Sequence, residues 1–201
     1  MFIKKAKRNI QFLTIGNISN KEGFDMNICI YAAASENIDK KYILEIEELG
    51  SLLAKEGHQL VYGAGSTGLM GAAARGFRKE NGTVIGVTPE FMDEKEPLFE
   101  DCTELITTKT MAERKWIMEK RANVFLIVPG GIGTMDEFFQ VVTLVYLELF
   151  NRPIIVYNYD HFYTKLLEFM TEAAEKGFIN ERVKEFVRVA KTKEEILGFL
   201  K

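Results

Sequence analysis

The chain has 201 residues, of which 47% are hydrophobic and 27% are charged, and these values are typical of a globular protein. The length favours one domain over two. A net charge of −3 leaves no basic field for a polyanion, so we expect no nucleic-acid polymer as a partner. The two cysteines, Cys29 and Cys102, form no CxxC pair, so the sequence predicts neither a disulfide framework nor a metal site.

Residues 1–25 are basic at first and weakly patterned, with no uninterrupted apolar run and no small-residue cleavage site, so they do not read as a secretory signal. The sequence contains no stretch of about 18 apolar residues that could span a bilayer. We therefore expect a cytoplasmic protein without membrane contact. The predicted organisation is an N-terminal extension of unknown role over residues 1–25 and a single α/β domain over residues 26–201.

Beyond the extension, short apolar runs alternate with longer amphipathic ones, as in repeated βα units. The predicted strands are Met26–Ala34, Gln59–Tyr62, Thr83–Val87, Thr103–Thr107, Val124–Val128 and Ile154–Tyr157, with one more ending at Arg188 and Val189. The predicted helices are Asp39–Glu56, Leu69–Lys79, Met111–Ala122, Met135–Phe150, Phe162–Lys176 and Lys193–Leu200. This alternation predicts a doubly wound α/β fold, with a mostly parallel sheet and helices on both faces. In such sheets, ligands bind outside the carboxyl ends of the strands.

The helix predicted over Met135–Phe150 is apolar around most of its circumference. Its apolar residues are Phe138, Val141, Val142, Leu144, Val145, Leu147, Leu149 and Phe150. One sheet cannot cover such a helix, and helices of this kind are buried on more than one side. We expect a second subunit to supply the other cover, and the sequence therefore predicts a homodimer.

A glycine-rich turn, Pro129-Gly130-Gly131-Ile132-Gly133-Thr134, leads into this helix. Glycines let a ligand approach the backbone closely, and the free N–H groups at a helix start form an anion site that fits a phosphate. Thr134 adds a hydroxyl donor. The alternative is an ordinary tight turn in which Thr134 caps the helix and Glu137 is its capping-box partner.

Glu137 follows Thr134 by three residues, so both lie on one face of the helix and the carboxylate can reach a ligand in the loop. A carboxylate at phosphate-plus-sugar distance suits glycosidic chemistry, because the transition state gains positive charge on the sugar ring. Glu137 would stabilise that charge, act as a base on water, or do both.

An earlier glycine turn, Gly63-Ala64-Gly65-Ser66-Thr67-Gly68, satisfies the GxGxxG pattern of dinucleotide binding, and the acidic Glu90 follows about twenty positions later. This turn belongs to the second βα unit, whereas a dinucleotide fingerprint normally occupies the first. We therefore favour close helix packing and a contribution to a mononucleotide pocket, and we keep an NAD-dependent oxidoreductase as a minor alternative.

Arg114 and Lys115 are adjacent cations near the start of a helix, where the helix dipole disfavours positive charge. A negatively charged partner or ligand would offset that cost. Taken alone, the pair favours a solvated face on which Glu113 and Glu119 are the partners.

Together, Met111-x-Glu113-Arg114-Lys115 and Pro129-Gly-Gly-x-Gly-Thr-x-x-Glu137 resemble the motifs of the LONELY GUY (LOG) family of nucleoside 5'-monophosphate phosphoribohydrolases. Members of that family are often labelled lysine decarboxylases. The resemblance runs from about Met26 to Leu200. It includes Gly63–Gly71, Val84–Val87 with Pro89, and Gly177-Phe178-Ile179.

The resemblance implies a Rossmann-like fold, a dimer, and hydrolysis of a nucleoside 5'-monophosphate to free base and ribose 5-phosphate with no metal or organic cofactor. It implies that Arg114 and Glu137 are catalytic. Substrate-binding residues carried over from the motifs are Glu96, Lys115, Gly130, Gly131, Gly133, Thr134 and Thr143. To these we add Gly65 and Ser66 of the first glycine turn and Ser35 after the first strand.

The sequence departs from the family pattern at two motifs. Ala112 stands where histidine is usual, and Ala32-Ala33-Ala34-Ser35 replaces a Cys-Gly-Ser-Ser type of turn, which keeps Ser35 and removes the glycine. The Ala112 departure keeps a second hypothesis open, namely a non-catalytic nucleotide or molybdenum-cofactor carrier of the same fold. A true lysine decarboxylase would need a pyridoxal phosphate site, which no pattern in the chain supplies. His58 and His161 lie apart from the motifs, and we expect both to be structural.

Overall fold

The computed structural model describes residues 25–92 and 96–201. The extension predicted over residues 1–25 therefore lies outside the described residues, apart from Asp25. No helix in the described ranges is long and apolar enough to cross a membrane.

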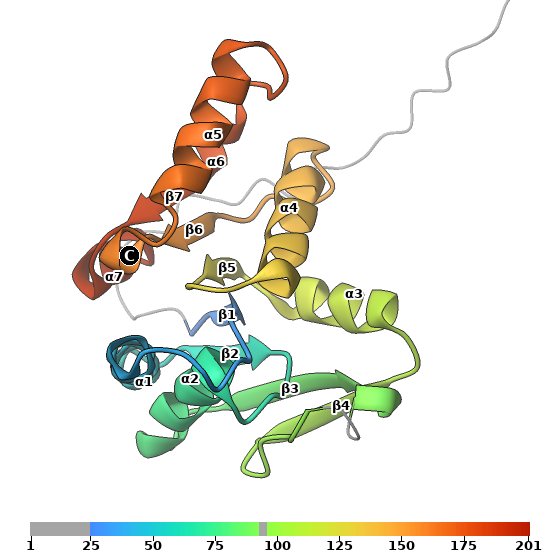
Figure 1. The fold of residues 1–201 in the computed structure, drawn as a ribbon. Helices are drawn as coiled ribbons and strands as arrows, with labels where there is room; N and C mark the ends of the chain where they lie inside the picture. The colour runs from blue at the N-terminus through green and yellow to red at the C-terminus, as the bar shows by residue number, and fades with distance from the viewer. Residues whose placement is uncertain (1–24, 93–95) are drawn as a thin grey trace, which may run out of the picture.

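Strands and helices alternate along the chain, as the sequence predicts (Figure 1). The strands are β1 (Asn27–Tyr31), β2 (Gln59–Tyr62), β3 (Val84–Pro89), β4 (Glu104–Thr108), β5 (Val124–Ile127), β6 (Ile154–Tyr157) and β7 (Val187–Ala190). The helices are α1 (Lys40–Lys55), α2 (Gly68–Lys79), α3 (Met111–Arg121), α4 (Ile132–Tyr146), α5 (Thr164–Glu175), α6 (Val183–Phe186) and α7 (Lys193–Phe199). Two short 3-10 turns, η1 (Glu90–Met92) and η2 (Tyr159–His161), follow β3 and β6.

The strands form one parallel sheet in the order β4-β3-β2-β1-β5-β6-β7. The chain winds outward from β1 to β4, returns to the centre, and winds the other way from β5 to β7. The direction of winding changes between β1 and β5, which pair in register from Ile28 opposite Val124 to Tyr31 opposite Ile127. The predicted doubly wound α/β fold is confirmed, and its switch point lies between these two strands.

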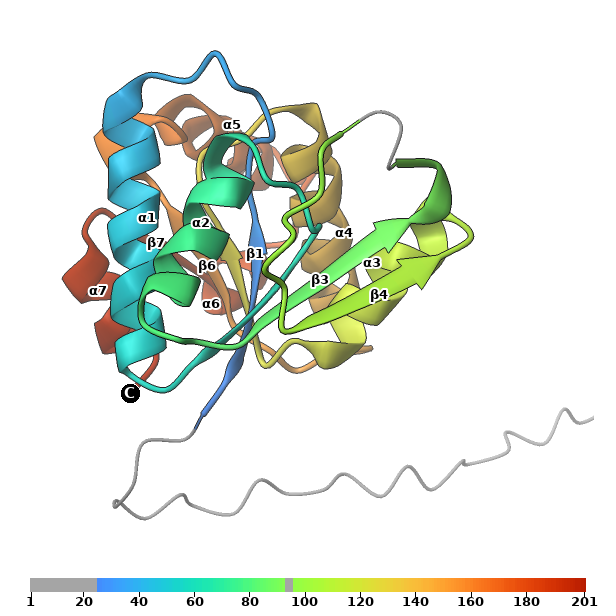
Figure 2. The ribbon, with the colours of Figure 1, turned by 90° about the horizontal axis from the view of Figure 1, so that it is seen from below.

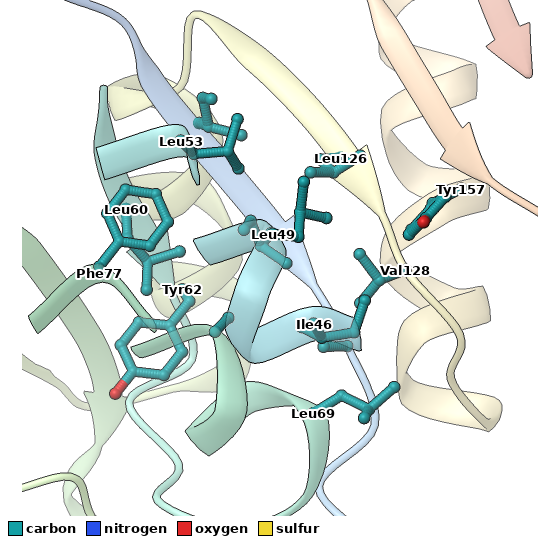
Figure 3. Packing of buried hydrophobic residues seen from close by; sticks show 14 of the residues in the cluster. Ile46, Leu49, Leu53, Leu60, Tyr62, Leu69, Phe77, Leu126, Val128 and Tyr157 are labelled. Carbon is teal, nitrogen blue, oxygen red and sulfur yellow. The ribbon is translucent and has the colours of Figure 1, made fainter. Parts of the chain in front are cut away.

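Alternation along the strands divides the core into two layers. Ile28 and Ile30 of β1 face α1, α2 and α7, whereas Cys29 and Tyr31 face α3, α4 and α5. Figure 3 shows the first layer, in which the α1 residues Ile46, Leu49 and Leu53 pack among side chains of β2, α2 and β5. Figure 2 shows α1 and α2 lying across one face of the sheet, with α3 and α4 behind it. Because helices cover both faces of the sheet, a ligand can reach it at the ends of the strands.

Two predicted elements have bounds that the structure corrects. β1 ends at Tyr31 and not at Ala34, because the backbone of Ala33 turns away from the sheet: its carbonyl accepts hydrogen bonds from the N–H groups of Leu69 (2.8 Å) and Met70 (3.2 Å) in α2. α4 spans Ile132–Tyr146 and not Met135–Phe150, so Leu147, Leu149 and Phe150 lie beyond its end.

Candidate active site

The glycine turn at residues 129–134 lies at the switch point, where β5 leads into α4. The helix begins at Ile132, with Gly131 as the preceding cap residue, and no side chain caps it within the described residues. Gly131 and Gly133 are exposed, and the Ile132 side chain is 88% exposed. The start of α4 therefore presents uncapped N–H groups at the carboxyl edge of the sheet, which is the arrangement that binds anions.

Thr134 lies inside the first turn of α4 and is only 3% exposed. The alternative in which Thr134 caps the helix and Glu137 completes a capping box is therefore wrong. A Thr134 cap would start the helix at Met135, but the helix begins at Ile132. Gly130 makes room for this threonine: a Cβ atom on Gly130 would lie 2.1 Å from Thr134 Oγ1. Gly130 must therefore be a glycine because the Thr134 side chain occupies the space that a larger residue would need.

Arg114 reaches from α3 across the strand ends. Its Nε donates to the Val87 carbonyl in β3 (3.1 Å), and its Nη1 donates to Glu137 Oε1 in α4 (3.3 Å). Each side chain of this ion pair is 11% exposed. The interpretation of Arg114 as part of a solvated face with Glu113 and Glu119 is wrong, because the guanidinium is buried against Glu137.

Gly63, at the end of β2, supports the guanidinium of Arg114. A Cβ atom at Gly63 would lie 1.9 Å from Arg114 Nη2, so any other residue would displace the arginine. The first glycine turn thus contributes to the site by leaving space for Arg114. Gly63 and the Val87 carbonyl were not among the predicted site residues, and only the GxGxxG spacing pointed towards Gly63.

Burial raises the pKa of the Glu137 carboxyl from 4.5 to about 7, although the positive charge of Arg114 opposes the rise. A carboxyl with a pKa near neutrality exchanges its proton at physiological pH, which is the property required of a general acid or base. Glu137 therefore combines a fixed position with a protonation state that can change during a reaction.

Lys115, the neighbour of Arg114, forms an ion pair with Asp136 (Nζ to Oδ2, 2.9 Å), and its side chain is 16% exposed. Asp136 was not predicted as a site residue. Two pairs, Arg114 with Glu137 and Lys115 with Asp136, thus connect the start of α3 to the first turns of α4. Both cations lie next to the helix start that the glycine loop forms.

Glu96 is carried by a segment that pairs with the first glycine turn. The Ser66 N–H donates to the Pro97 carbonyl (2.9 Å), and the Phe99 N–H donates to the Ala64 carbonyl (2.9 Å). A Cβ atom on Gly65 would lie 3.6 Å from the Glu96 carboxyl carbon. Burial raises the pKa of Glu96 and the charge of Arg114 lowers it, so Glu96 shares the electrostatic environment of the Arg114–Glu137 pair.

The same turn argues against the dinucleotide alternative. A pyrophosphate would need free N–H groups at the start of α2, but those of Leu69 and Met70 already donate to the Ala33 carbonyl. The Thr67 hydroxyl also donates to the Ala34 carbonyl, at 2.7 Å. The first glycine turn therefore binds the alanine segment after β1, and α4 alone of these two helices starts with an open anion site.

The structure brings Ser35 to the glycine loop but leaves Thr143 elsewhere. Ser35 lines a mostly apolar cavity of about 300 Å³ together with Gly130, Gly131 and the aromatic side chains of Tyr42 and Phe162. Arg114 and Glu137 do not line this cavity. Thr143 lies further along α4, in a surface hollow with Asp136 and Phe139, and its hydroxyl donates to the Phe139 carbonyl (2.8 Å). Its role in substrate binding stays a prediction.

The two histidines lie away from the ion pairs. His58 is buried at the opposite end of β1, where its Nδ1 accepts a hydrogen bond from the Met26 N–H (3.4 Å). His161 lies in η2 with a positive φ of 60°. No cluster of three or more potential metal ligands occurs within residues 25–92 and 96–201.

These features define a class: a doubly wound α/β protein with an open helix start and a buried Arg–Glu pair at its switch point. A family model described as "Possible lysine decarboxylase" matches residues 70–200. The cytokinin riboside 5'-monophosphate phosphoribohydrolase of Rhodococcoides fascians is 35% identical over 166 residues, which are 82% of this chain and 84% of that protein. The cytokinin riboside 5'-monophosphate phosphoribohydrolase LOG3 of Arabidopsis thaliana is 32% identical over 170 residues, which are 85% of this chain and 79% of that protein. The chain belongs to this family, the LONELY GUY family.

Solved structures with a similar fold include the molybdenum cofactor carrier protein of Chlamydomonas reinhardtii, with a TM-score of 0.66 and 21% identity over 88% of this chain and 96% of that one. The molybdenum cofactor binding protein of Rippkaea orientalis gives a TM-score of 0.65, also at 21% identity, with the same coverage. At this level of identity, the similarity shows the fold alone.

Replacing Glu137 by glutamine is expected to change how stability depends on pH. A carboxyl whose pKa is raised by folding binds its proton more tightly in the folded chain, so the free energy of unfolding falls as pH rises from 4.5 to about 7. Glu137→Gln removes this loss of about 2–3 kcal/mol. Urea unfolding of both proteins at about pH 5 and about pH 8 measures the difference. The same pH dependence in both would contradict a buried carboxyl that retains its proton.

Proposed function

We propose that this protein hydrolyses the N-glycosidic bond of a nucleoside 5'-monophosphate and releases the free base and ribose 5-phosphate. The observation that carries the proposal is the buried Arg114–Glu137 pair beside the uncapped start of α4. The names of the relatives, which are cytokinin riboside 5'-monophosphate phosphoribohydrolases, support the same reaction and favour an adenine-type base.

The substrate phosphate is proposed to bind at the start of α4. The N–H groups from Gly131 to Thr134 are available there, and the helix dipole contributes about half a positive charge. Lys115 of α3 adds a full positive charge, and its ion pair with Asp136 holds it beside the first turn of α4. Each charge-assisted hydrogen bond to phosphate contributes about 1.5–3 kcal/mol, so the loss of one donor weakens binding without removing the chemistry.

Glu137 is the proposed base. The water oxygen forms a bond to C1' of the ribose while the bond from C1' to the base nitrogen breaks, and the base leaves with that electron pair. Glu137 takes the proton that the water loses and later returns it to solvent, while the departing base nitrogen takes up a proton from solvent. A carboxyl with a pKa of about 7 is matched to this exchange, and its negative charge stabilises the cationic sugar of the transition state.

Arg114 is proposed to balance charge in the site. Its guanidinium pairs with Glu137, and its hydrogen bond to the Val87 carbonyl keeps it beside the reacting group. The planar fork of arginine presents several donors in a fixed geometry, so it can hold the carboxylate and a substrate oxygen together. Glu96 and the first glycine turn complete the wall of the site on the side of β2 and β3. Ser35 and the apolar cavity offer room for a further part of the ligand.

Adenine release from AMP, followed by chromatography, tests the proposed reaction. We expect Glu137→Gln, which keeps the size of the side chain and removes its basicity, to lower kcat at least about 100-fold. The matched control is Glu172→Gln on the exposed surface of α5, which should retain the natural rate.

Two results would count against the proposal. One is the absence of adenine from the natural protein, and tight AMP binding in that case would indicate a carrier. The other is an equal rate in the natural protein and in Glu137→Gln, which would remove Glu137 from the chemistry.

We also propose that the protein forms a homodimer through the region around the end of α4. Apolar side chains are exposed there: Phe139 (39%), Tyr146 (39%), Leu147 (56%) and Leu149 (65%). Soluble monomers rarely expose large apolar patches, and a contiguous one indicates an interaction site. A twofold axis through this patch would bury the same surface on both copies.

The double substitution of Leu147 and Leu149 by glutamate is expected to convert the dimer to a monomer, because paired negative charges would be buried at the interface. Sedimentation velocity measures the change. Leu44→Glu is the matched control, since Leu44 is 57% exposed but lies on α1, on the other face of the sheet. A natural protein that sediments as a monomer would contradict the proposed dimer.

A further inference from the structure

Tyr31, the last residue of β1, has a buried hydroxyl group with no hydrogen-bond partner among the described residues. The residue is 1% exposed, and its ring stacks on Phe125 at a centroid distance of 6.2 Å and an interplanar angle of 7°. Two other buried tyrosines donate to oxygen acceptors, Tyr157 to Glu45 and Tyr163 to the Val128 carbonyl, whereas the Tyr62 hydroxyl contacts the Cys102 sulfur. A phenylalanine would fill the space of Tyr31 without burying an unpaired hydroxyl, so this oxygen requires an explanation.

The position of Tyr31 connects it to the active site. It ends the strand at the switch point, and its side chain enters the layer between the sheet and the helices α3 and α4. Arg114 and Glu137 come from these same two helices. Within the described residues, Arg114 alone forms a hydrogen bond with the Glu137 carboxylate, and it does so through Oε1 at 3.3 Å. A donor without an acceptor and a carboxylate with one donor therefore share one buried layer.

The charges in this layer define the protonation state of the phenol. The titratable and charged groups that face Tyr31 and Glu137 are Cys29 from β1, Arg114, Lys115 and Glu119 from α3, and Asp136 from α4. Burial and the negative charge of Glu137 raise the pKa of Tyr31, so its hydroxyl keeps its proton and acts as a donor. The Cys29 thiol of the same strand lies close enough to interact with this hydroxyl, but sulfur is a weak acceptor, so the hydroxyl still has no oxygen acceptor.

We propose that Tyr31 is a positioning residue, whose hydroxyl donates a hydrogen bond to the Glu137 carboxylate when the substrate occupies the site. This inference rests on the proposed function. Arg114 is also proposed to contact a substrate oxygen, so the carboxylate needs another donor to stay fixed and ionised. A short O–H···O⁻ bond from Tyr31 supplies it, and the buried setting strengthens that bond.

Tyr31→Phe tests the assignment, because it removes one oxygen and keeps the ring. We expect kcat for AMP to fall about ten-fold with KM nearly unchanged. The acid limb of the pH profile of kcat should move up by about one unit, because Glu137 loses a donor that favours its ionised form. The thermal midpoint should not fall, since the hydroxyl has no oxygen acceptor among the described residues.

Tyr62→Phe is the matched control. Tyr62 ends the neighbouring strand β2, is equally buried, and faces the opposite layer, where its hydroxyl contacts the Cys102 sulfur. Its kcat and pH profile should match those of the natural protein. If the natural protein hydrolyses AMP and Tyr31→Phe behaves as Tyr62→Phe does, the assignment of Tyr31 is overturned while the proposed function stands.

If the natural protein releases no adenine, the proposed function fails and a second measurement decides the inference. The pKa of the Glu137 carboxyl, followed by carbon-13 NMR with AMP present, should then be higher in Tyr31→Phe than in the natural protein. Equal values would overturn the assignment. A lower thermal midpoint in Tyr31→Phe with an unchanged pH dependence would show a purely structural hydroxyl and would overturn it as well.

Discussion

The ion pair between Arg114 and Glu137 is the interaction on which the rest of the site depends. Burying two charges is costly unless each has further partners, and here the partners come from different parts of the fold. The Val87 carbonyl of β3 accepts from the guanidinium, Gly63 after β2 leaves space for it, and α4 supplies the carboxylate. Arg114 of α3 thus connects β3, in one half of the fold, to α4, in the other half. The same burial gives Glu137 a pKa close to neutrality, which an exposed carboxylate would not have.

The topology makes this convergence possible. Parallel strands end at one edge, and reversal of the winding between β1 and β5 opens that edge at its centre. The two glycine turns then serve different purposes. The turn after β5 leaves the start of α4 uncapped, while the turn after β2 packs against Arg114 and the segment that carries Glu96. The uncapped start of α4 and the buried Glu137 carboxylate therefore lie beside each other.

Much of the fold could be predicted because its signals are local: apolar runs, helical periodicity and glycine turns between them. The paired motifs around Arg114 and Glu137 also identified the residues that the structure brings together. Other features depend on contacts between distant segments. The start of α4 at Ile132, the use of the Ala33 carbonyl to cap α2, and the space at Gly63 follow from tertiary packing. No sequence pattern marked the unpaired hydroxyl of Tyr31, because it is defined only by what surrounds it.

The central claim is that folding buries Glu137 beside Arg114 and leaves it with a proton that exchanges near neutral pH. Carbon-13 NMR titration of the glutamate side-chain carboxyl groups tests it most directly, with the Glu137 signal assigned by its absence from Glu137→Gln. The Glu137 carboxyl should titrate with a pKa of about 7. A Glu137 signal that titrates near the ordinary glutamate value of about 4.3 would contradict it.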